Sequence, residues 1–132
     1  MALFGPMQID GEFGPYTQEC LQRWLRFNGY YTTAYKIDGD FGKESVKALQ
    51  RLLKSGGNMY PGTYKGAIDG DPGKMTWTAW WDYLHNAGWW ASGRVYTDNI
   101  KPFKRMGSAT AKMTQMALNA NRSNPTGRLD PQ

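Results

Sequence analysis

Cysteine and histidine are almost absent from this sequence. The chain of 132 residues holds one cysteine, Cys20, and one histidine, His85. A single cysteine cannot form an internal disulfide, which excludes the cross-links of small secreted domains. An ordinary zinc site needs several cysteine or histidine ligands, so none is predicted. We expect Cys20 to be a small core residue, and His85 to be a surface residue or a cation near a helix end.

Long apolar runs are also lacking. No stretch approaches the roughly 20 apolar residues that a membrane-spanning helix needs. Residues 1–6 do not combine a basic start with an apolar segment, so no signal peptide is predicted. Hydrophobic residues make up 40% of the chain and charged residues 20%, a composition typical of a globular domain with a core.

Positive charge is concentrated in the last third of the chain. Residues 1–87 hold nine Lys/Arg and nine Asp/Glu, whereas residues 88–132 hold seven Lys/Arg against Asp98 and Asp130. The whole net charge of +5 therefore lies in the C-terminal third. Such a region would attract an anionic polymer.

A turn followed by a helical pattern recurs along the chain. The central copy is residues 37–53, which begin Ile37-Asp38-Gly39-Asp40-Phe41-Gly42, and Asp-Gly turns recur at 10–11 and 69–70. Aligned on the glycine before each helix, the copies repeat about every thirty residues, which indicates a repeated supersecondary unit. Three copies are clear. A fourth, aligned on Gly107, is degenerate because Asp98-Asn99-Ile100 replaces its Asp-Gly turn.

Apolar spacing predicts helices near 15–28, 43–56, 73–87 and 107–121. The second of these carries Val46, Leu49, Leu52 and Leu53 on one face and has Lys47, Gln50, Arg51 and Lys54 on the opposite, polar face. The first three helices are expected to end at glycines in the left-handed conformation, namely Gly29, Gly57 and Gly88.

The fold class that follows is all-α. We predict a small orthogonal helical bundle built from three clear and one degenerate turn–helix repeats. Residues 1–88 form the repeat region. Residues 89–132 are an extension that we expect to pack on the same domain.

Motif and spacing together resemble the peptidoglycan-binding-like module of cell-wall hydrolases. The resemblance lies in Asp-Gly-x-x-Gly-x-x-Thr followed by Leu-Gln-x-x-Leu, carried here by 37–42 and Leu49-Gln50-Arg51-Leu52-Leu53. Residues 68–77 also resemble the family's closing Gly-x-x-Thr-Trp segment, and the likeness covers about residues 9–88. Two departures stand out: an acid follows both central Asp-Gly turns, where the family usually has an apolar residue, and 89–132 extend beyond the module.

The resemblance implies a small helical bundle that acts as a non-catalytic targeting module of an amidase, muramidase or phage endolysin. The expected partners are cell-wall glycan, stem peptide or an anionic wall polymer, together with a catalytic domain in the same or a partner chain. No cofactor and no metal are expected. A chain without a signal peptide would be made in the cytoplasm and act at the bacterial wall.

Acidic residues of the repeat could instead suggest calcium. Asp38 and Asp69 each begin an acidic turn, but the twelfth loop position, which needs a bidentate acid, holds Leu49 or Trp80. We therefore expect these aspartates to accept hydrogen bonds from turn amides. No pair of carboxylates stands apart from the repeat as glycoside hydrolysis would require.

Aromatic linkers supply the candidate ligand contacts, because tyrosine and tryptophan faces stack on sugar rings. Two bulky residues follow each terminating glycine, and the first is expected to pack back on its helix. The second has no such role. The candidates, with two further linker tyrosines and one arginine of the basic region, are Tyr31, Tyr35, Tyr60, Tyr64, Trp90 and Arg94. The alternative role for these rings is to seal gaps between helices.

Two other function classes remain open from the sequence. A small stand-alone lytic enzyme would need an acid pair or metal site that the pattern does not reveal. A nucleic-acid-binding domain would fit the basic, aromatic composition, but the cations are not grouped on one predicted helix and no recognised motif is present.

Overall fold

The computed structural model describes residues 5–31, 35–55, 62–96 and 106–121. These residues form four helices of equal length: α1 (Pro15–Phe27), α2 (Lys43–Ser55), α3 (Lys74–Asn86) and α4 (Ser108–Ala120). The predicted all-α fold is confirmed, and every predicted helix boundary lies within one residue of the observed one.

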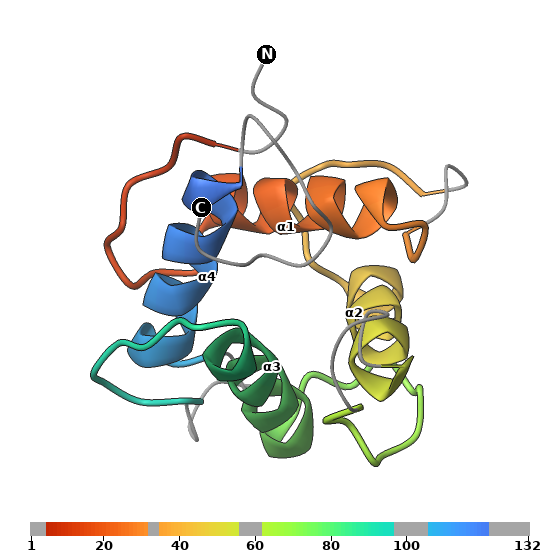
Figure 1. The fold of residues 1–132 in the computed structure, drawn as a ribbon. Helices are drawn as coiled ribbons and strands as arrows, with labels where there is room; N and C mark the ends of the chain where they lie inside the picture. Colours follow the sequence, from red (N-terminus) through yellow and green to blue (C-terminus); the bar gives the residue numbers. More distant parts are fainter. Residues whose placement is uncertain (1–4, 32–34, 56–61, 97–105, 122–132) are drawn as a thin grey trace.

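The helices lie along the sides of a closed ring (Figure 1). Each packs against the next in the chain, and α4 packs back against α1. Because α4 belongs to the extension 89–132, part of that extension completes the bundle. None of the described helices is both long and apolar enough to cross a membrane.

Glycines set the helix ends. At the start of α1, the Gly14 carbonyl accepts the N–H of Gln18 at 2.9 Å, and Pro15 occupies the first helical position, where no N–H is needed. At the end, Gly29 has φ +84°, and the Tyr30 N–H donates to the Leu25 carbonyl at 3.0 Å. This is the terminating motif that the sequence predicts.

The end of α3 repeats this geometry. Gly88 has φ +111°, and the Trp89 N–H donates to the Leu84 carbonyl at 3.0 Å. The first bulky residue after each of these glycines therefore packs back on its helix, as expected. Gly57 lies outside the described residues.

Aromatic side chains fill the middle of the ring. Trp24 of α1 meets Trp80 and Tyr83 of α3 across the bundle, with ring centroids 5.7 and 6.2 Å from that of Trp24. A second group joins Phe13 and Phe41, which precede α1 and α2, to Trp77 of α3. These contacts connect opposite sides of the ring, which neighbouring helices alone would not do.

Aliphatic and small residues complete the core. Its leucines are fully buried, and Cys20 is 1% exposed beside them, as predicted for a small core residue. Burial raises the pKa of the Cys20 thiol, which keeps it in the neutral form.

Candidate functional site

A buried glutamine on one helix holds the Asp-Gly turn that precedes the next helix. We call this contact a joint. The same position, eight residues after the N-cap glycine, supplies the glutamine in three helices, and each side chain is at most 1% exposed. The three glutamines are Gln22, Gln50 and Gln115.

The Gln50 joint shows how the amide is used. Its Oε1 accepts the Gly70 N–H at 2.9 Å, and its Nε2 faces a carboxylate oxygen of Asp69 at 3.1 Å and the hydroxyl of Thr76 at 3.0 Å. Asp69 in turn accepts the Asp71 N–H at 2.9 Å. One side chain therefore holds a complete turn, since the amide offers a donor and an acceptor together.

Gly70 is required at this turn. Its φ is +75°, a conformation that residues with a Cβ rarely adopt, and an added Cβ would lie 3.0 Å from the Lys43 carbonyl oxygen. The turn thus requires both residues of the Asp-Gly pair: the aspartate accepts the turn amide, and the glycine adopts the left-handed backbone conformation.

The Gln115 joint closes the ring. Its Oε1 accepts the N–H groups of Asp10 and Gly11, both at 3.1 Å, and its Nε2 donates to an Asp10 carboxylate oxygen at 2.8 Å. Asn119, one turn further on, accepts the Met7 N–H and donates to the Met7 carbonyl, both at 2.8 Å. The fourth repeat therefore holds the first with the same chemistry that links repeats adjacent in sequence.

Among the four described helices, α3 alone has another residue at this position. Trp81 stands there, partly buried, and its ring stacks on His85 with centroids 4.9 Å apart. The turn that a glutamine here would hold contains Asp98-Asn99-Ile100, which lies outside the described residues. The sequence thus departs from the repeat at both of the positions that would form a joint between α3 and α4.

The buried glutamines correct one prediction from the sequence. The amphipathic pattern places Gln50 on the polar face, whereas the structure buries it completely. Hydropathy cannot separate a solvated amide from one that is buried and satisfied. The available signal was the recurrence of glutamine eight residues after Gly14, Gly42 and Gly107.

Joint aspartates accept turn amides, as the sequence predicts: each takes the N–H two residues further on. Among the described residues, no group of three His, Cys, Asp or Glu side chains could hold a metal ion. The pKa of each joint aspartate is lowered, chiefly by the N–H two residues further on and next by the glutamine amide. The three residues are Asp10, Asp38 and Asp69.

Acid should therefore weaken the fold. The pKa values of the three joint aspartates are lower in the folded protein than in the unfolded chain. The ionised aspartates therefore stabilise the fold fully at pH values above the ordinary aspartate pKa, and this stabilisation is lost as the pH falls through the lowered pKa values. We expect urea unfolding midpoints to stay level from pH 7 to about 5 and to fall below about pH 4. In the triple variant Asp10→Asn, Asp38→Asn, Asp69→Asn the fall should be shallower; an equally steep fall would show that other groups cause it.

Linkers are held by a second repeated contact. The Tyr31 N–H donates to the Leu25 carbonyl, and the Tyr31 hydroxyl donates to the Lys36 carbonyl at 2.6 Å. The guanidinium of Arg26 lies over the Tyr31 ring, 5.4 Å from its centroid. The ring therefore supports the backbone of its own linker.

The next linker uses the same arrangement. The Tyr64 N–H donates to the Leu53 carbonyl, the Tyr64 hydroxyl donates to the Ala67 carbonyl at 2.6 Å, and Lys54 lies over the ring. Arg26 and Lys54 each stand twelve residues after an N-cap glycine. The two tyrosines are thus equivalent parts of the scaffold.

These contacts correct the expectation that Tyr31 and Tyr64 contact ligand. Their exposed fractions are only 5% and 4%, and both hydroxyls are occupied by backbone carbonyls. Both tyrosines therefore take the alternative role of sealing the bundle. The sequence could not distinguish ligand contact from sealing of the bundle. A tyrosine can be buried once its hydroxyl has one hydrogen-bond acceptor, and any linker carbonyl can supply that acceptor.

The other candidates are at the surface or outside the described residues. Trp90 is 64% exposed, Tyr35 is 42% exposed and stacks on Tyr31, and Arg94 is exposed. Tyr60 lies outside the described residues. Trp90 and Arg94 share the linker between α3 and α4, whereas Tyr35 lies between α1 and α2, and no contact among the described residues joins Tyr35 to the other two.

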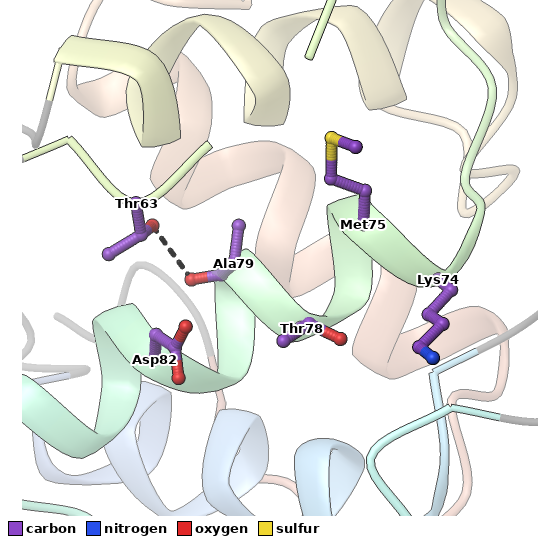
Figure 2. A pocket seen from close by; sticks show the side chains of 6 residues that line it. All are labelled: Thr63, Lys74, Met75, Thr78, Ala79 and Asp82. Atoms are coloured by element: carbon purple, nitrogen blue, oxygen red, sulfur yellow. Dashed lines mark hydrogen bonds between the residues drawn. The ribbon is translucent and has the colours of Figure 1, made fainter. Parts of the chain in front are cut away.

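A pocket opens on the outer side of α3, where sequence analysis placed no candidate. Its volume is about 410 Å³, and it is lined by Thr63, Lys74, Met75, Thr78, Ala79 and Asp82 (Figure 2). The Thr63 hydroxyl donates to the Ala79 carbonyl at 2.9 Å, which fixes the preceding linker against the helix. Lys74 lies near the start of α3 and Asp82 two turns further on. The pocket thus combines a mainly apolar lining with two opposite charges.

Comparison with known proteins identifies no relative of this chain. No protein-family model, curated protein or solved structure matches the chain.

Proposed function

We propose that this protein is a non-catalytic module that binds the bacterial cell wall and targets a lytic enzyme, such as a phage endolysin, to peptidoglycan. The observation that supports this proposal is that the residues carrying the family resemblance all have a structural role. Its Asp-Gly turn and its Leu-Gln pair form the joints, as Asp69-Gly70 and Gln50 do. The repeated polar residues therefore build a scaffold and leave recognition to the outer surface.

The outer surface offers chemistry suited to a wall polymer. Trp90 and Tyr35 present aromatic faces to solvent, and such faces stack on sugar rings. Arg94 and the basic last third add attraction for anionic polymers. A catalytic domain in the same or a partner chain would supply the hydrolysis.

Sedimentation with purified walls tests the proposal. We expect the protein to pellet with walls, and the double variant Tyr35→Ala, Trp90→Ala to bind about tenfold more weakly, since two stacking contacts of about 0.7 kcal/mol each would be lost. Phe27→Ala is the matched control, because Phe27 is an equally accessible aromatic on a helix rather than a linker, at 49% exposed.

Two results would count against wall binding through these residues. The protein could stay in the supernatant with walls of every species tested, or the double variant could pellet as the wild type does. Repeating the assay across salt concentrations separates the contributions, because screening weakens only the electrostatic part.

A further inference from the structure

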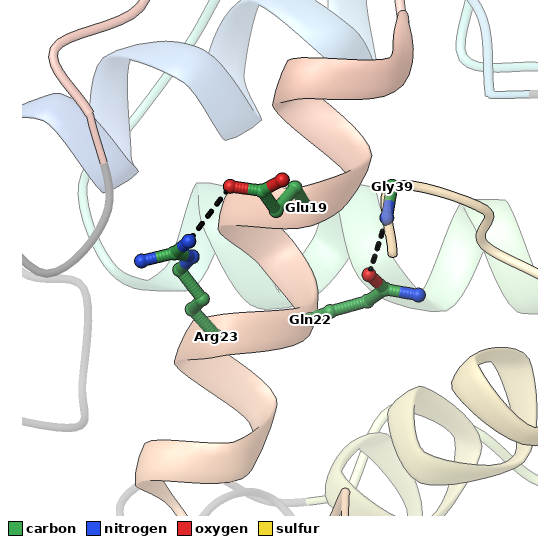
Figure 3. A network of polar contacts seen from close by, with 4 residues as sticks. All are labelled: Glu19, Gln22, Arg23 and Gly39. Atoms are coloured by element: carbon green, nitrogen blue, oxygen red, sulfur yellow. Dashed lines mark hydrogen bonds and ion pairs between the residues drawn. The ribbon is translucent and has the colours of Figure 1, made fainter. Parts of the chain in front are cut away.

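The outer faces of α1 and α3 differ at one pair of equivalent positions. On α1, Arg23 and Glu19 form an ion pair at 2.9 Å (Figure 3). Counted from the N-cap glycines Gly14 and Gly73, the same positions on α3 hold Asp82 and Thr78. The charge is therefore reversed at one position and its partner is removed at the other.

Asp82 is left without a strong partner. Its carboxylate makes no hydrogen bond and no salt bridge with any residue of the described ranges, and the side chain is partly buried. Burial raises the pKa of Asp82, and the nearby His85 opposes this only in part. A partly desolvated carboxylate gains more from an added cation than a solvated one does.

Five of the six residues that line the pocket beside Asp82 come from α3. Lys74, Thr78 and Asp82 stand four residues apart and form one row, while Met75 and Ala79 form the next. Figure 2 shows Thr63 beside Ala79, whose carbonyl accepts its hydroxyl. A ligand lying here would have aliphatic contacts along its length and the Asp82 carboxylate at one end. Near the other end is the Lys74 ammonium group, which lies over the Tyr96 ring, 5.4 Å from its centroid.

We propose that this pocket binds a short peptide with a free primary amine on an aliphatic side chain, its ammonium group against Asp82 and a carboxylate towards Lys74. Eight residues of helix separate the two, a rise of about 12 Å. A diamino acid side chain with one further residue spans that distance. The diamino acid of a wall stem peptide has this chemistry, and its assignment as the natural ligand rests on the proposed function.

Titration with synthetic stem peptide tests the pocket directly. The probe is the tetrapeptide L-Ala-D-Glu-L-Lys-D-Ala, followed by ¹H–¹⁵N NMR of the whole chain. We expect shifts at Thr63, Met75, Thr78 and Asp82, and about tenfold weaker binding when the lysine amine of the peptide is acetylated. Asp82→Asn should weaken binding of the free-amine peptide to a similar degree.

Glu19→Gln is the matched control, since it removes a carboxylate from the equivalent face of α1 and should leave peptide affinity unchanged. If Asp82→Asn fails to fold, the acetylated peptide against the wild-type protein still tests the role of the amine. Equal affinity for free and acetylated peptide, or no shifts at millimolar peptide, would overturn the inference.

Wall sedimentation run in parallel separates the two proposals. If the protein pellets with walls but does not bind the peptide, the result would overturn the pocket assignment alone. If the protein binds the peptide through Asp82 but stays in the supernatant when walls are pelleted, the result would support the pocket and refute wall targeting.

Discussion

Gln50→Leu should lower the free energy of unfolding by about 3 kcal/mol, because each buried polar group left without a partner costs about 1–3 kcal/mol. The Gly70 N–H loses its acceptor, and the Thr76 hydroxyl and an Asp69 carboxylate oxygen lose the amide at 3.0 and 3.1 Å; the Asp71 carbonyl keeps the Gly73 N–H. Leucine is close in size to glutamine, so little of the loss would come from packing. Urea denaturation followed by circular dichroism measures the change.

The control for this variant is Gln8→Leu, which makes the same chemical change at an exposed position. It should stay within about 0.5 kcal/mol of the wild type. Gln50→Glu separates volume from hydrogen bonding, since it keeps the shape but points an acceptor at the Asp69 carboxylate. A Gln50→Leu protein as stable as the Gln8→Leu control would show that the joint does not stabilise the fold.

Trp80→Ala should lower the free energy of unfolding by about 4 kcal/mol, the middle of the range for truncating a buried aromatic residue to alanine. Trp80 is 0% exposed, and its ring lies 5.7 Å from that of Trp24 and 5.6 Å from that of Tyr83. Its Nε1 donates to the Thr114 hydroxyl at 2.8 Å, which links α3 to α4. Truncation would leave a cavity between three helices.

Thermal unfolding and the near-ultraviolet circular dichroism of the aromatic core measure this loss. Trp90→Ala is the control, because a 64% exposed side chain contributes little to folding stability. Trp80→Phe should recover part of the loss by filling the cavity without restoring the indole N–H. Equal unfolding temperatures for Trp80→Ala and Trp90→Ala would contradict the role of Trp80 in the core.

Helices were predictable because their limits depend on local chemistry. Glycines such as Gly14 and Gly29 mark where the backbone must leave the helical conformation, and apolar spacing identifies the buried face. The aspartates of the turns were predictable for the same reason, since Asp38 accepts an amide only two residues away. Neither prediction needs knowledge of distant contacts.

Roles that depend on distant contacts could not be predicted. The sequence places Gln50 on a solvated face, but the turn at Gly70, twenty residues away, covers its side chain. It also leaves Tyr64 free to contact ligand, but the Tyr64 hydroxyl donates to the carbonyl of Ala67 in its own linker. The pocket beside Asp82 needs Thr63 from a linker as well as the face of α3. Such sites form by packing, which a residue pattern in one segment does not encode.

Closure of the ring by Gln115 fixes the number of repeats. An open stack of repeats can gain or lose a unit at either end, and it needs end units with a polar outer face. Here the contact between the fourth and first repeats already uses both of those ends. A fifth unit could enter only by separating Gln115 from Asp10, so this architecture favours a set number of units over growth.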